Sequence, residues 1–194
     1  MLLVKGQRQV GKTYIIEKFG RDNYANVVVL NFMKDADLKT IFEGDLDVDS
    51  ISKTMSLFLP EEKLIPGETL LILDEIQDCP RARTALKFFS IDGRFDVIAI
   101  GSLLGVNIRR NKPMGEEYAL VPVGFEEHMT MYSLDFEEFL WANGIRDDVI
   151  EDIRGCIERK EPLGPAYMDR LWNLFKDFMI IGGMPEAVQD FIDR

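Results

Sequence analysis

The chain has 194 residues, of which 46% are hydrophobic and 29% are charged, and its formal net charge is −11. No apolar run approaches the roughly 20 residues that cross a bilayer, so we expect a cytoplasmic protein with one core, a helical addition and no membrane partner. The acidic balance disfavours a large nucleic-acid-binding surface, which needs clustered Lys and Arg. A local basic patch could still contact nucleic acid.

The first motif is a glycine-framed loop directly after the apolar run Leu2–Val4. Its form is G-x-x-x-x-G-K-T, a spacing in which two glycines let successive backbone N–H groups converge on phosphate oxygens. Lys12 would reach the β and γ phosphates of a nucleoside triphosphate, and Thr13 would offer its hydroxyl to Mg²⁺. The residues expected to contact the nucleotide are Gly6, Gln7, Arg8, Gln9, Val10, Gly11, Lys12, Thr13 and Tyr14. An ordinary glycine-containing turn between a strand and a helix is the alternative, which the motifs downstream disfavour.

Strand-like and helix-like stretches alternate along the chain, which predicts a parallel sheet with helices on both faces. The expected strands are Leu2–Val4, Val27–Phe32, Leu70–Asp74 and Val97–Ile100, with a fifth near His128–Tyr132. The expected helices are Thr13–Phe19, Ile51–Leu59 and Arg83–Ser90. The predicted fold class is therefore α/β: a P-loop NTPase three-layer α/β/α sandwich with a mostly parallel five-stranded sheet, followed by a partial helical subdomain.

Two carboxylates follow the apolar run Leu70–Leu73, as expected of a buried strand that delivers acids to the carboxyl edge of a parallel sheet. Asp74 suits a Mg²⁺ ligand, because Mg²⁺ prefers one or two carboxylates together with phosphate oxygens. Glu75, already leaving the strand, suits the group that polarises an attacking water. The two acids could instead be the polar end of a strand before a turn, an interpretation that the upstream loop disfavours.

A third motif is the strand pattern Phe95–Ile100, which is followed by Gly101 and Ser102. In P-loop ATPases whose catalytic Glu follows the Mg²⁺ Asp, a further strand lies between the loop strand and the acid strand and carries a polar sensor at its tip. Ser102 fits that place and would hold the nucleophilic water or sense the γ-phosphate, although Ser and Gly also end ordinary strands. Arg109 and Arg110 in the following loop are candidates for a transition-state arginine given to a neighbouring subunit, against the alternative of a solvated basic loop.

From Asp135 onward the pattern turns helical, which predicts a helical subdomain at 135–194 after a P-loop domain at 1–134. Its apolar stripes comprise Phe136, Phe139, Leu140, Leu171, Leu174, Phe175 and Phe178, with Trp141 and Trp172 beside them. We expect these residues to form a core, and a groove for a protein partner or a second copy is the alternative. The string Gly182–Pro185 predicts a helix stop followed by Pro at the start of the next helix.

Five strings follow one another along the chain: Lys5–Thr13, Leu73–Gln77, Ile100–Gly105, Tyr132–Leu140 and Gly182–Val188. Through them the chain resembles the prokaryotic AAA+-type ATP-binding proteins that carry an accessory C-terminal domain of unknown function. The resemblance implies ATP as the ligand, with Lys12, Thr13 and Asp74 binding nucleotide and Mg²⁺, and Glu75 as the hydrolytic residue. Members of that family usually have a segment before the first strand and continue further, so we expect this chain to be truncated at both ends.

The predicted function is Mg²⁺-dependent ATP hydrolysis, which depends mostly on positioning and charge stabilisation. In that mechanism Lys12 holds the phosphates, Thr13 and Asp74 hold the metal, Glu75 aligns the water and Ser102 assists. The alternative is a nucleotide-dependent switch or scaffold that acts on partners through the helical tail, with slow or absent turnover. A small-molecule kinase is disfavoured, because no arginine-rich lid follows the acid strand.

Overall fold

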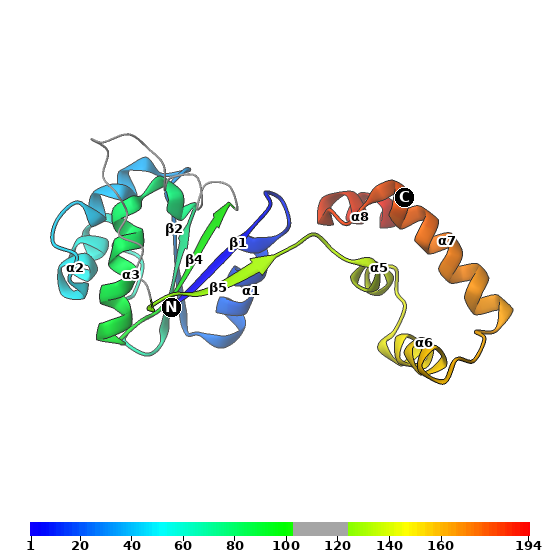
Figure 1. The fold of residues 1–194 in the computed structure, drawn as a ribbon. Coiled ribbons are helices and arrows are strands. Elements are labelled where there is room, and N and C mark those ends of the chain that lie inside the picture. The colour runs from blue at the N-terminus through cyan, green and yellow to red at the C-terminus, as the bar shows by residue number, and fades with distance from the viewer. Residues whose placement is uncertain (103–123) are drawn as a thin grey trace. The chain divides into compact units, whose positions relative to one another are not determined.

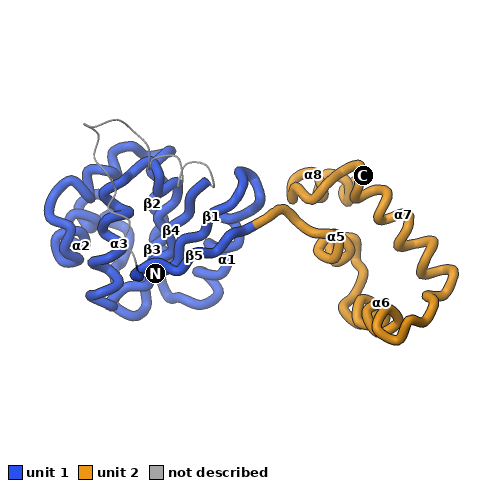
Figure 2. Tube along the Cα trace, in the orientation of Figure 1, with its two compact units in different colours: residues 1–131 blue, residues 132–194 orange. Residues whose placement is uncertain are grey.

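The computed structural model describes residues 1–102 and 124–194. The chain forms two compact units, 1–131 and 132–194, which are coloured separately in Figure 2. The boundary follows Met131, whereas the sequence predicts a division after residue 134. None of the helices in the described part of the chain combines the length and the apolarity that crossing a bilayer demands.

The described part of unit 1 is built on a five-stranded sheet in the order β2-β3-β4-β1-β5, with parallel pairing between neighbours (Figure 1). Its strands are β1 (Leu2–Gly6), β2 (Asn26–Asn31), β3 (Thr69–Asp74), β4 (Asp96–Ser102) and β5 (Glu127–Met131). Its helices are α1 (Lys12–Asn23), η1 (Ala36–Phe42), α2 (Val48–Phe58), η2 (Ile76–Asp78) and α3 (Pro80–Asp92). The predicted α/β class is confirmed, and β4 lies between β1 and β3 as the sensor pattern predicts.

Apolar side chains cover both faces of this sheet, which gives three layers. Every residue of β3 is buried, as a continuous apolar run in a central parallel strand requires. On one face, Ile16 of α1 packs with Val4 and Leu70. On the other face, α2 and α3 contribute residues such as Met55 and Leu86 to a larger apolar cluster. The two cores hold the strands rigidly, so that their carboxyl ends can present polar groups at one edge.

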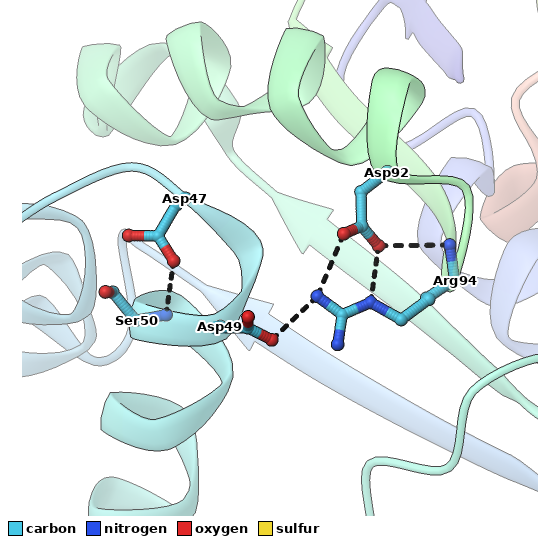
Figure 3. Close-up of polar contacts among 5 residues, drawn as sticks. All are labelled: Asp47, Asp49, Ser50, Asp92 and Arg94. Atoms are coloured by element: carbon cyan, nitrogen blue, oxygen red, sulfur yellow. Dashed lines mark hydrogen bonds and ion pairs between the residues drawn. The ribbon is translucent and has the colours of Figure 1, made fainter.

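A cluster of charged residues ties the start of α2 to the end of α3 (Figure 3). Asp47 caps α2 by accepting a hydrogen bond from the backbone N–H of Ser50 at 2.9 Å. Arg94 pairs with Asp92 at 2.7 Å and with Asp49 at 2.7 Å, and these carboxylates raise the pKa of Arg94. Because the cluster is largely open to water, solvent and salt screen it, and we expect it to orient the two helices more than it stabilises the core.

Unit 2 is a set of helices with its own apolar cluster. The helices are α5 (Phe136–Ala142), α6 (Asp147–Arg159), α7 (Pro165–Ile181) and α8 (Pro185–Ile192). A capping box starts α5: Asp135 and Glu138 each accept a hydrogen bond from the other's backbone N–H, at 2.9 Å. The buried cluster consists of Phe139, Leu140, Ile150, Leu174 and Val188.

The two tryptophans differ from the expectation that they belong to the core. Trp141 is 46% exposed and Trp172 is 59% exposed, whereas Phe139 is fully buried. Each tryptophan follows an apolar stripe residue by one position, and one helical step turns a side chain by about 100°. That step carries the indole rings off the apolar face.

The helix stop predicted at Gly182–Pro185 is confirmed, and Gly183 also packs closely against another backbone segment. Gly182 ends α7 with a φ of 77°, and Pro185 begins α8. The carbonyl oxygen of Gly183 accepts a hydrogen bond from Leu134 N at 2.8 Å. A Cβ added to Gly183 would lie 1.9 Å from Leu134 O, so only glycine allows these two backbone segments to approach.

Candidate functional site

The predicted phosphate loop joins the end of β1 to the start of α1 at the carboxyl edge of the sheet. Gln9 and Gly11 have φ values of 65° and 87°, so the backbone enters the left-handed region twice. Turns of this kind direct N–H groups into a concavity that suits an anion, next to the positive end of the helix. The side chains of Gln7, Arg8 and Gln9 are exposed, whereas Val10 is buried and anchors the loop.

The first glycine of the loop is required by a close approach between strands. In the register of β1 and β5, Gly6 lies opposite Met131. A Cβ added to Gly6 would lie 2.3 Å from Met131 O. Any side chain at this position would force the end of β5 away from the beginning of the loop.

Lys12 is the first residue of α1, and its ammonium group lies over the loop. Its Nζ donates hydrogen bonds to Gly6 O at 3.1 Å and Gln7 O at 2.5 Å. Burial lowers the pKa of Lys12, and the carboxylates of Glu75 and Asp74 oppose that shift because they favour the charged form. The lysine is thus a buried cation with carbonyl partners that an anionic ligand could replace.

A hydrogen bond between Thr13 and Asp74 joins the loop to the acid strand. Thr13 Oγ1 donates to Asp74 Oδ2 at 3.2 Å, across 61 positions of sequence. Asp74 ends β3 and is only 5% exposed, and burial raises the pKa of this carboxyl group. The hydrogen bonds from Glu75 N and Thr13 partly offset that shift. Tyr14, which follows Thr13, is 69% exposed.

Asn31 is a member of this site that the sequence analysis missed. It ends β2, and its Nδ2 donates a hydrogen bond to Asp74 Oδ2 at 2.9 Å. Its Oδ1 accepts from the backbone N–H groups of Met33 at 3.1 Å and Lys34 at 2.8 Å. Because both ends of the amide are engaged, Asn31 presents a fixed donor to the buried carboxylate.

Glu75 lies at the turn between β3 and the short helix η2. Its φ of 52° places it in the left-handed region, which is unusual for a residue with a side chain. The side-chain amide of Gln77 donates a hydrogen bond to Glu75 Oε2. Both residues are half-buried at the same edge of the sheet as Asp74.

Ser102 ends β4 and lies opposite Gly6 in the register of β4 and β1. It is half-buried and therefore stands at the edge where the loop begins. Its strand position is the one predicted from the sequence, and its role as a sensor stays a prediction. The candidate arginines Arg109 and Arg110 lie outside the described residues.

The ends of three parallel strands, β1, β3 and β4, thus bring the predicted residues of the loop, Asp74, Glu75 and Ser102 to one edge of the sheet. Two further residues, Asn31 and Gln77, contact the predicted acids directly. A signal for Asn31 was available, because it is a polar residue at the end of an apolar strand, as Ser102 is. Gln77 offered no comparable signal, because its contact depends on the conformation of the turn.

Comparisons with known proteins agree with this architecture. Residues 1–140 match a family model described as an AAA domain. Among solved structures, the Walker-type ATPase PABY2304 of Pyrococcus abyssi is similar to this chain, with 14% identity and a TM-score of 0.50. The similarity covers 96% of this chain and 60% of that protein, and at this identity it concerns the fold alone. No curated protein matches the chain.

Proposed function

Since this chain belongs to the AAA domain family of P-loop ATPases, we propose that it binds ATP together with Mg²⁺ and hydrolyses the terminal phosphate. The observation that carries the proposal is the 3.2 Å hydrogen bond between Thr13 Oγ1 and Asp74 Oδ2. It brings the phosphate loop and the acid strand into one site, as a metal-bound polyphosphate requires. If the loop and Asp74 lay far apart, the loop could be an ordinary turn between a strand and a helix, and Asp74 the polar end of a strand.

The residues at this edge have the chemistry of a Mg²⁺ site. Mg²⁺ takes oxygen ligands and usually combines one or two carboxylates with phosphate oxygens and water. Thr13 supplies a hydroxyl oxygen and Asp74 a buried carboxylate, whose raised pKa reflects the cost of a negative charge with little solvent. A cation would compensate that charge. When bound, Mg²⁺ would neutralise charge on the phosphate oxygens.

The remaining roles follow from the side chains. Lys12 would exchange the carbonyl oxygens of Gly6 and Gln7 for phosphate oxygens, which bind an ammonium ion more strongly. Glu75 would accept a hydrogen bond from a water molecule and orient it toward the γ-phosphorus. The water oxygen forms the new bond, the bond to the bridging oxygen of ADP breaks, and the water proton passes toward Glu75 or phosphate. Ser102, at the tip of β4, would help to hold that water.

Replacing Glu75 with glutamine tests the proposal. Glu75→Gln preserves the shape of the side chain but removes its charge, so we expect phosphate release from ATP to fall by about 10²- to 10⁴-fold. ATP binding, measured with Mg²⁺ in the absence of turnover, should remain within about twofold of wild type, because the loop, Lys12 and Asp74 are unchanged.

A matched control is Glu61→Gln, which makes the same change at an exposed turn after α2. It should leave both phosphate release and ATP binding unaffected. Equal rates for Glu75→Gln and wild type would remove Glu75 from the mechanism. Tight ATP binding by the wild-type chain without phosphate release would instead favour the nucleotide-dependent switch.

A further inference from the structure

We propose that Gln77 is a positioning residue for Glu75, holding its carboxylate in the orientation that hydrolysis requires. The inference rests on the proposed function, because it assigns Gln77 a part in the same reaction. Its basis is the hydrogen bond from Gln77 Nε2 to Glu75 Oε2. A carboxylate has two oxygens, so a donor on one of them fixes the side chain and leaves the other to accept from water.

The orientation of the Gln77 amide supports a role beyond filling space. Its Oε1 is buried, and within the described part of the chain it has no hydrogen-bond partner. Rotating the amide by half a turn would direct Oε1 at the carboxylate of Glu75, and two acceptors would then face each other. The contact with Glu75 therefore determines the orientation of the amide, although it leaves a buried acceptor unsatisfied.

The backbone of the turn brings the two side chains together. Glu75 has left-handed backbone geometry and caps η2, where its carbonyl oxygen accepts from Asp78 N at 2.9 Å. Ile76, between the two polar residues, is fully buried and fixes the turn to the core. Consequently the side chains of Glu75 and Gln77 are in contact although the residues are only two positions apart. In a regular helix, side chains at that separation do not face each other.

Glu75 needs such support because its side chain has three rotatable bonds. Without a fixed partner the carboxylate would populate several rotamers, and most of them would not face a water molecule aligned with the phosphate. Misplacing a catalytic group by about 1 Å can reduce the rate by about 100-fold. Nucleotide binding depends on other groups, so a positioning role predicts a loss of kcat without a loss of affinity.

The test compares two substitutions of similar length. Gln77→Met keeps an unbranched side chain but has no donor, and Gln77→Glu keeps the shape but places an acceptor against Glu75. For each we expect kcat for ATP hydrolysis to fall by about 10- to 100-fold, with KM and the Kd for ATP within about twofold of wild type. A second carboxylate adds repulsion, so Gln77→Glu should be at least as slow as Gln77→Met.

Gln189→Met is the matched control, because it removes a similar side-chain hydrogen bond in unit 2, which holds none of the predicted catalytic residues. Gln189 Nε2 donates to the carboxylate of Asp193 at 2.9 Å in the exposed part of α8. This variant should keep the wild-type kcat. Each Gln77 variant is also checked by thermal unfolding, because damage to the turn would lower the unfolding midpoint and ATP affinity together.

The outcomes separate this inference from the proposed function. If Glu75→Gln loses hydrolysis while Gln77→Met keeps a kcat within twofold of wild type, the positioning role is wrong and the function stands. A joint fall of kcat, ATP affinity and unfolding midpoint in Gln77→Met would also overturn it, in favour of a structural role. If Glu75→Gln hydrolyses ATP at the wild-type rate, the proposed mechanism and this inference fail together.

Discussion

Replacing Gly6 with alanine tests whether the loop depends on the close approach of β5. The added Cβ would lie 2.3 Å from Met131 O, whereas an ordinary contact between carbon and oxygen is about 3.3 Å. Relief of this overlap requires a displacement of about 1 Å between the ends of two paired strands. Overpacking of this kind costs about 1–3 kcal/mol, and we expect Gly6→Ala to lower the free energy of unfolding of unit 1 by that amount.

The assay is equilibrium unfolding in urea, followed by far-ultraviolet circular dichroism. This signal reports the sheet and helices of unit 1 together with the helices of unit 2, and the part of the transition that shifts in Gly6→Ala is assigned to unit 1. Tryptophan fluorescence is unsuitable here, because Trp141 and Trp172 both belong to unit 2. ATP affinity, measured in parallel, should fall because the displaced strand end is the start of the loop.

Gly44→Ala serves as the control for the loss of a glycine. A Cβ at Gly44 would meet nothing within 4 Å, and its backbone lies outside the left-handed region. Its free energy of unfolding should remain within about 0.5 kcal/mol of wild type. Equal stability and equal ATP affinity of Gly6→Ala and Gly44→Ala would refute the packing explanation for the first glycine.

Three further substitutions test other contacts. Gly183→Ala places a Cβ 1.9 Å from Leu134 O. The free energy of unfolding of unit 2, measured in urea by tryptophan fluorescence, should therefore fall by about 1–3 kcal/mol or more. An unchanged urea midpoint would contradict the close approach. Asp74→Asn should raise the thermal midpoint at pH 7 without nucleotide, because the folded protein holds the Asp74 proton more tightly than the unfolded chain does. Ionisation of the Asp74 carboxyl therefore lowers the stability of the fold as the pH rises through its raised pKa. The difference in thermal midpoint between Asp74→Asn and wild type should shrink as the pH falls toward the ordinary pKa of 3.8. Identical midpoints of the two proteins at pH 7 would show that burial of this charge has no cost. Asn31→Leu removes the 2.9 Å hydrogen bond to Asp74 and should lower the free energy of unfolding in urea by about 1–3 kcal/mol. The loss should be smaller when Asp74 is already replaced by asparagine. Equal losses with and without Asp74→Asn would argue that the amide does not act through the carboxylate.

The parts of the site that the sequence predicts are those with a local pattern. The glycine-framed loop, the apolar run that ends in Asp74 and the strand that ends in Ser102 each occupy one short stretch. Their alternation with helices indicates a parallel sheet, and the carboxyl ends of parallel strands meet at one edge. From these two facts the sequence predicts that the loop and the acids lie together at one edge of the sheet.

Side-chain exposure shows where that reasoning ends. A helical stripe predicts which face is apolar, and Phe139 and Leu174 are buried as expected. It does not predict how far the buried face extends around the helix. Trp141 and Trp172 fall just beyond that limit, although both are large apolar residues.

The amino-acid sequence by itself therefore determines the fold class, the phosphate loop and the strand that carries the acids, because periodicity and glycine spacing act over a few neighbouring residues. Only the tertiary structure decides that Asn31 supports Asp74, that Gln77 contacts Glu75, and that Met131 leaves no room for a side chain at Gly6. Those contacts depend on strand register and on the path of a single turn. A shift of about 1 Å in either would break these contacts, because a hydrogen bond requires a separation of about 2.7–3.2 Å. A pattern of residue types along the chain does not determine distances that finely.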